Sequence, residues 1–188
     1  ASSCFDAGST HLPEWVESRE QSETRIFRDS FFIVLDGPPE LAWKVVKGIG
    51  GNTGWYFGTF LWKIRGFVDK VLGGPGLSRG RRRLGSLGVG DSLDFWRVVA
   101  VEECNRLLLK AEMLAPGEAF LEFRIEVLPD GTNELRMTPS FEPHGVWGRI
   151  YWWIIAPSHS LMFGFMLKQM AKAAGAAVLS GPSCVKEG

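Results

Sequence analysis

The chain has 188 residues, enough for one domain with a sizeable core, and its 45% hydrophobic and 22% charged content is typical of a globular protein rather than a disordered or fibrous one. Its 21 Lys and Arg residues balance 21 Asp and Glu residues, so no global field favours nucleic acid, which is excluded as a partner. The unusual feature is eight Trp and thirteen Phe beside two Tyr, a large aromatic content that is used for packing or for binding.

The three cysteines, Cys4, Cys104 and Cys184, are far apart in the sequence and form no CxxC pair. His11, His144 and His159 are also scattered, so the sequence indicates neither a disulfide framework nor a metal site. It predicts free thiols in a reducing compartment, either the cytoplasm or an organelle entered by way of a targeting segment removed before Ala1. No cofactor is predicted, because the chain has no dinucleotide or phosphate-binding fingerprint.

The chain divides into a polar N-terminal arm at residues 1–24, a folded domain at 25–175 and a flexible tail at 176–188. The Phe-, Ile- and Val-rich stretch 24–37 predicts a strand that stops at an Asp-Gly turn. Residues 38–51 open with two prolines and close on two glycines, which predicts a short helix. A second helix is predicted at 52–74.

A loop rich in glycine and arginine follows, and then four segments alternate between apolar and polar residues at 92–103, 105–114, 119–129 and 133–141. Turn signals separate them, so they form an antiparallel meander. Since alternate side chains share a face of a strand, one face is apolar and the other carries the charges. The apolar face consists of Leu107, Leu109, Ala111, Met113, Leu121, Phe123, Ile125, Val127, Leu135, Met137 and Phe141.

Residues 146–167 are long and apolar enough to cross a bilayer, with Arg149 as the one full charge. Pro157 and the polar residues 158–160 interrupt this segment at its middle. In addition, the apolar face of the sheet must be buried by another element, and this segment can bury it. We therefore expect an aromatic segment to about Ile155, a bend at Pro157, and a helix over 158–174 lying across the sheet. A stripe of small or polar residues, repeated every four positions, marks the edge of this helix that meets water: Ser160, Gly164, Lys168 and Lys172.

The order of strand, two short helices, antiparallel strands and long C-terminal helix resembles the α+β helix-grip fold of the START, polyketide cyclase-like and pollen-allergen-like (SRPBCC) superfamily, in which a curved sheet wraps around the helix. Four stretches carry a narrower resemblance: "GWYFGTFLWKIRGFVDKVLGGPGLSRGRR", "VGDSLDFWRV", "LLLKAEMLAPGEAFLEF" and "FEPHGVWGRIYWWIIAPSHSLMFGFML". They are similar to an uncharacterised bacterial domain that often follows an NmrA-like NAD(P)-binding domain. The resemblance implies an NAD(P)-binding reductase as a partner. Two departures are His144, where that domain usually has Arg, and the lack of a preceding GxGxxG motif.

A sheet that curves around one helix predicts a cavity between them. Its expected sheet-side wall is Leu109, Phe123, Met137 and Phe141, and its helix-side wall is Trp152, Met162 and Met166. Trp96, Arg97 and His159 are candidate ligand contacts, the last two as polar anchors. The alternatives are that Trp96 fills the core, that Arg97 lies outside paired with Glu102, Glu112 or Glu122, and that His159 satisfies backbone groups at the proline bend.

Three functions follow from these residues. The first is a binding module for a hydrophobic or aromatic small molecule such as a lipid, an isoprenoid or a polyketide-like compound. The second is a cyclase- or dehydratase-type enzyme in which His159 and Arg97 move protons, although no catalytic motif is visible. The third is a membrane- or protein-docking domain that uses the aromatic residues near Trp55 and an arginine cluster: Arg79, Arg81, Arg82 and Arg83.

Overall fold

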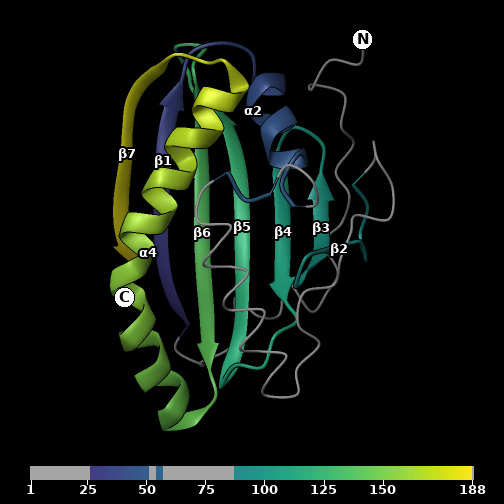
Figure 1. Cartoon of the computed structure of the whole chain (residues 1–188). Coiled ribbons are helices and arrows are strands. Elements are labelled where there is room, and N and C mark those ends of the chain that lie inside the picture. The colour runs from purple at the N-terminus through teal and green to yellow at the C-terminus, as the bar shows by residue number, and fades with distance from the viewer. Residues whose placement is uncertain (1–25, 51–53, 57–86, 188) are drawn as a thin grey trace.

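Figure 1 shows the computed structural model, which describes residues 26–50, 54–56 and 87–187. Two helices and seven strands lie in these residues, in the chain order β1 Phe27–Leu35, α2 Pro39–Lys47, β2 Ser92–Leu93, β3 Trp96–Glu102, β4 Arg106–Ala111, β5 Gly117–Val127, β6 Asn133–Pro143, α4 Gly145–Ala174 and β7 Val178–Glu187. The strands form one antiparallel sheet in the order β2-β3-β4-β5-β6-β1-β7.

Helices α2 and α4 cover the same face of this sheet, with the long α4 lying along β1 and β6 (Figure 1). The architecture is therefore α+β, with a sheet around a long C-terminal helix, and the expected fold class is confirmed. The first of the two short helices is α2, whose N-terminal turn carries Pro39 and whose C-cap is Gly48. The predicted helix over residues 52–74 lies outside the described residues, apart from 54–56.

The face of the meander predicted to be apolar forms the core. Leu107 pairs with Phe123 and Phe123 with Met137 across three strands, so their side chains share the helix-covered face. Trp43 of α2 and Met166 of α4 pack in the same buried cluster. Val127 is the exception, because at the last residue of β5 its side chain is exposed.

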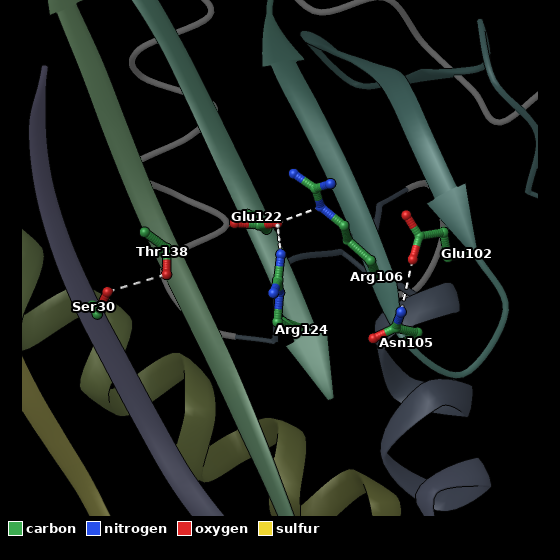
Figure 2. Close-up of polar contacts among 7 residues, drawn as sticks. All are labelled: Ser30, Glu102, Asn105, Arg106, Glu122, Arg124 and Thr138. Atoms are coloured by element: carbon green, nitrogen blue, oxygen red, sulfur yellow. Dashed lines mark hydrogen bonds and ion pairs between the residues drawn. The ribbon is translucent and has the colours of Figure 1, made fainter. Parts of the chain in front are cut away.

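The opposite face carries cross-strand ion pairs (Figure 2). Glu122 on β5 accepts hydrogen bonds from Arg106 on β4 and from Arg124, and Glu112 is bound by Arg97 at 2.5 Å. Glu112 and Glu122 are therefore held by guanidinium groups on the outer face. On the same face the Ser30 and Thr138 hydroxyls lie 3.3 Å apart and join β1 to β6.

The predicted bend of the C-terminal segment is confirmed. The arms Gly145–Pro157 and Leu161–Ala174 make an angle of 53° within one 30-residue helix, so the aromatic segment is the first arm of α4. Pro157 has no N–H to donate and its ring crowds the preceding turn, which accounts for the kink. Among the described residues no single helix is long and apolar enough to cross a membrane, although the two arms pass together by length and composition.

The flexible tail predicted at 176–188 is wrong, because strand β7 occupies Val178–Glu187 and pairs with β1 along most of its length. The Gly-Pro pair at 181–182 indicated a turn. In the structure Gly181 adopts φ 94° where the register shifts between Phe32 and Val34, so a bulge accommodates it. Without β7, β1 would be an open edge, and pairing along that edge gives the segment its strand conformation.

The prediction of free thiols holds for one cysteine and fails for another. Cys184 is free and exposed, whereas Cys104, in the turn between β3 and β4, is disulfide-bonded. Cys4 lies outside the described residues. The reducing compartment predicted from cysteine spacing stays a prediction.

Candidate functional site

His159 is buried near the bend of α4, two residues after Pro157, and faces Asp29 of β1. The imidazole Nδ1 lies 3.8 Å from a carboxylate oxygen of Asp29, which is too long for a hydrogen bond. Both side chains point into the helix-covered side of the sheet, because Phe27, Asp29 and Phe31 alternate with partly exposed Arg28 along β1. The bend and β1 therefore bring together a buried base and a buried acid.

Aromatic rings surround this pair. The His159 ring is 5.1 Å from the Trp152 ring in an edge-to-face arrangement and 5.1 Å from the Phe163 ring. Trp152 stacks on Phe27 at 5.5 Å and on Phe141 at 6.0 Å. The imidazole thus contacts two aromatic rings of α4, and Trp152 in turn stacks on rings of β1 and β6.

Burial lowers the pKa of His159 to about 4 by desolvation of its charged form. The imidazole is therefore neutral at pH 7, and its contact with Asp29 is not a salt bridge under those conditions. Among the described residues, Nδ1 has no hydrogen-bond partner. A neutral imidazole with so low a pKa can accept or donate a hydrogen bond, but it is a weak proton acceptor at neutral pH.

The predicted cavity walls are largely filled core. Leu109, Phe123, Met137 and Met166 are each 0% exposed, so not even a water-sized void touches them. Phe141 and Trp152 belong to the separate aromatic cluster with Phe27, and Met162 is half-buried against the main core cluster. Within the described residues no cavity opens at these walls, because bulky Phe, Met and Leu side chains pack against one another there; the ligand-binding role of these residues stays a prediction.

Trp96 and Arg97 lie on opposite faces of β3. Trp96 is buried against Trp55, whose ring is 5.9 Å away, and against Phe95. Arg97 lies on the outer face, where Glu112 binds it and raises the pKa of its guanidinium. Arg97 is therefore not an anchor inside the fold, and the alternative of a core Trp96 with an outward Arg97 is correct.

The aromatic and arginine surface predicted near Trp55 is only partly described. Trp55 is buried and its indole N–H donates to Asp94 at 2.7 Å, so it is not an exposed membrane contact. The Tyr56 hydroxyl donates to the Val45 carbonyl at 2.9 Å, and burial raises the pKa of this phenol. Arg79, Arg81, Arg82 and Arg83 lie outside the described residues, so their role stays a prediction.

A cleft lies between the second arm of α4 and the paired edge of β1 and β7, with a volume of about 190 Å³. Its lining is Phe31, Leu161, Gly164, Phe165, Lys168, Pro182, Ser183 and Cys184. Phe31 lines the cleft, and its ring is 5.5 Å from Phe163, which contacts His159. The described part of the chain holds no group of three or more metal-binding side chains.

Sequence reasoning missed this cleft because β7 forms one of its walls. One sequence signal did point to it. The stripe of small and polar residues on the C-terminal helix includes Gly164 and Lys168, and both line the cleft. Gly164 leaves room, since a Cβ there would lie 3.8 Å from the Pro182 ring.

A family model described as a protein of unknown function (DUF2867) matches residues 22–166. The chain belongs to this family. The DUF2867 match ends within the second arm of α4, so it includes β1 and the bend but not β7. Among curated proteins no significant match is found.

The solved structures that resemble this member of the DUF2867 family are distant. A conserved protein of unknown function from Enterococcus faecalis is 14% identical over 85% of this chain and 77% of its own, with a TM-score of 0.43. The di-domain ARO/CYC StfQ of the steffimycin biosynthetic pathway is 12% identical over 86% of this chain and 55% of its own, with a TM-score of 0.46. The ZhuI aromatase/cyclase from Streptomyces sp. R1128 is 12% identical over 79% and 96%, with a TM-score of 0.41. Function is therefore argued from the residues of the chain itself.

Proposed function

We propose that this chain is a binding module for a small hydrophobic molecule that carries one anionic or strongly polar group, and that the molecule lies in the cleft between α4 and the β1–β7 edge. The observation that carries the proposal is the composition of the cleft. Phe31, Leu161, Phe165 and Pro182 give an apolar lining, and Lys168 supplies one cation. Such a lining binds the apolar body by contact and orients one charged end.

The size of the cleft limits the ligand. Its volume of about 190 Å³ is below the roughly 300–1,000 Å³ of most sites for drug-sized molecules. An apolar cavity of about 150 Å³ holds one benzene ring. The cleft therefore suits a single aromatic ring or a short acyl segment, or one end of a longer lipid, isoprenoid or polyketide-like compound whose remainder stays outside.

The geometry supports binding better than catalysis. An enzyme of the cyclase or dehydratase kind needs a proton donor or acceptor in contact with its substrate. His159 is not among the residues that line the cleft, and Arg97 lies on the opposite face of the sheet. If catalysis does occur, substituting His159 with Ala abolishes turnover; a binder retains its affinity and shows no turnover before or after the change. An NAD(P)-binding reductase partner stays a prediction.

Protection of the Cys184 thiol tests the proposal, because this free cysteine lines the cleft. The probe is 1-anilinonaphthalene-8-sulfonate, an aromatic molecule with one anionic group. Saturating probe is expected to slow maleimide labelling of Cys184 by about tenfold, as measured by peptide mass spectrometry. Unchanged labelling under conditions where the dye fluoresces would place the dye elsewhere and contradict the cleft as the binding site.

Two pairs of variants in α4 distinguish the contribution of the shape of the cleft to dye binding from the contribution of its charge. Gly164→Leu fills the cleft and is expected to abolish dye binding, whereas Ala173→Leu adds a similar volume at an exposed position and leaves it unchanged. Lys168→Met removes the cation of the cleft and weakens binding by about tenfold, as expected for a charge-assisted contact. Lys172→Met, one turn further along, is the control.

A further inference from the structure

The first arm of α4, Gly145–Pro157, is apolar on two opposite sides. Gly148 and Trp152 are buried against the rest of the fold. On the other side large apolar side chains face outward, with Trp147 76% and Trp153 70% exposed. We call this exposed set the arm face, and it consists of Val146, Trp147, Ile150, Trp153 and Ile154.

The arm face is continuous. At about 100° per residue these five positions fall within an arc of roughly 120°, the width of the buried stripe on an ordinary amphipathic helix. Leu161 and Phe165 continue the exposed apolar surface beyond the bend, on the second arm. A contiguous apolar patch of this kind on a folded chain marks a site of interaction with a membrane or with another protein.

The charges of α4 indicate what covers it. The helix contains no Asp or Glu, and its full charges are the cations Arg149, Lys168 and Lys172. Arg149 is exposed beside the arm face, and Lys168 lies over the Phe165 ring at 5.9 Å. Glu118, on β5 near the start of α4, is bound by Lys110 at 3.0 Å on the outer face of the sheet.

We propose that the arm face docks on a lipid bilayer surface that carries anionic headgroups. Trp is the residue that favours the membrane interface, because its ring is apolar and its N–H remains hydrated. Lys and Arg beside an apolar helix face keep their charged ends among the headgroups. A second copy of the chain fits less well, since pairing two such helices sets cation against cation.

This surface differs from the arginine loop considered from the sequence, and the proposal does not depend on the cleft. The first arm of α4 lies at one end of the molecule, beyond the end of β7 in the view of Figure 1. Arg149 beside the first arm and Lys168 and Lys172 on the second place positive charge along the whole bent helix.

Vesicle co-sedimentation of the full chain tests the proposal. Wild type is expected to bind phosphatidylcholine vesicles that contain phosphatidylglycerol, and to bind less as salt is raised. The double variant W147S/W153S should bind at least about tenfold more weakly. The double variant V89S/V127S, which alters two exposed apolar residues outside α4, should bind as wild type does.

Arg149→Gln gives a second measurement that leaves both Trp side chains in place. It should weaken binding to the anionic vesicles by about fivefold and leave the weak binding to pure phosphatidylcholine unchanged. Brominated lipids should quench the tryptophan fluorescence of wild type, and the quenching should be lost in W147S/W153S.

Three results would overturn the proposal. One is that wild type fails to bind anionic vesicles at low salt. Another is that W147S/W153S binds as tightly as V89S/V127S. A third is that light scattering shows a wild-type dimer which the Trp variant dissociates, since the arm face would then be a contact between two copies.

Discussion

His159 shows how far one side chain depends on its surroundings. In the sequence it is an isolated histidine after a proline, and the same residue fits a catalytic base, a ligand anchor or a partner for free backbone groups. Burial beside Trp152 and Phe163 makes it a weak base at neutral pH, because desolvation lowers its pKa to about 4. What remains is a neutral imidazole beside the Asp29 carboxylate, behind the wall of the cleft.

This environment predicts a pH dependence of stability. The folded-state pKa of about 4 is below the unfolded value of 6.5, so the unfolded chain binds the proton first as the pH falls. The corresponding part of the unfolding free energy is fully present above pH 6.5. It is lost as the pH falls from 6.5 to about 4, and the loss amounts to about 3 kcal/mol. The Asp29 side chain faces the imidazole at 3.8 Å.

Replacement by an uncharged residue isolates the effect. In His159→Gln the fall in unfolding free energy between pH 6.5 and 4 should shrink by that amount, measured by urea denaturation at each pH. The control is His144→Gln, since His144 is exposed at the N-cap of α4. An imidazole of His159 that titrates near pH 6.5 by NMR would show that it is not buried in this way.

At the scale of elements, α4 contributes to both proposed sites, because it forms one wall of the cleft and carries the arm face. Its first arm packs so closely on the turn between β4 and β5 that a Cβ on Gly148 would lie 2.3 Å from the Pro116 carbonyl oxygen and 2.7 Å from the Pro143 side chain. Its second arm is looser at Gly164, beside the cleft. The first arm of α4 therefore packs more closely on the rest of the fold at Gly148 than the second arm does at Gly164.

Two glycine substitutions in this helix should have opposite effects. Gly148→Ala should lower the unfolding free energy by about 1–3 kcal/mol, because backbone atoms must move to admit the methyl group. Gly164→Ala should raise it by up to about 1 kcal/mol, because alanine is the better helix former and no close contact opposes it. Guanidinium denaturation measures both. Equal stabilisation by both changes would show that the first arm does not approach Pro116 closely.

At the scale of the whole molecule, β7 completes the sheet. It protects β1, which would otherwise be the edge strand, and it supplies Pro182, Ser183 and Cys184 to the cleft. Asp36 donates its N–H to the Ala177 carbonyl at 2.9 Å, which fixes the point where the chain returns from α4 to the sheet. The same strand thus serves both stability and the proposed site.

Ending the chain after Ala177 should show this double role. The unfolding free energy should fall by about 3 kcal/mol or more, since a row of β1 backbone groups loses its partners. The open edge should also cause concentration-dependent association, visible by light scattering. Removal of Gly188 alone is the control. A truncated chain that stays monomeric and equally stable would mean that β7 is not a firm part of the sheet.

The sequence alone determined the features that depend on local pattern. Alternation in the four central strands placed Leu109, Phe123 and Met137 on the inner face and Glu122 on the outer one, because side chains alternate along any strand. The caps of α2 and the kink at Pro157 also follow from single residues whose backbone chemistry is fixed.

How those faces meet depends on contacts between residues that are far apart in the sequence. Whether Phe and Met side chains leave a cavity depends on how they interdigitate, and here they fill it. Residues 178–187 form a strand because β1 offers an edge far away in the sequence, and the cleft exists because that strand faces Gly164. Likewise the disulfide state of Cys104 and the low pKa of His159 arise from neighbours that the local sequence does not name.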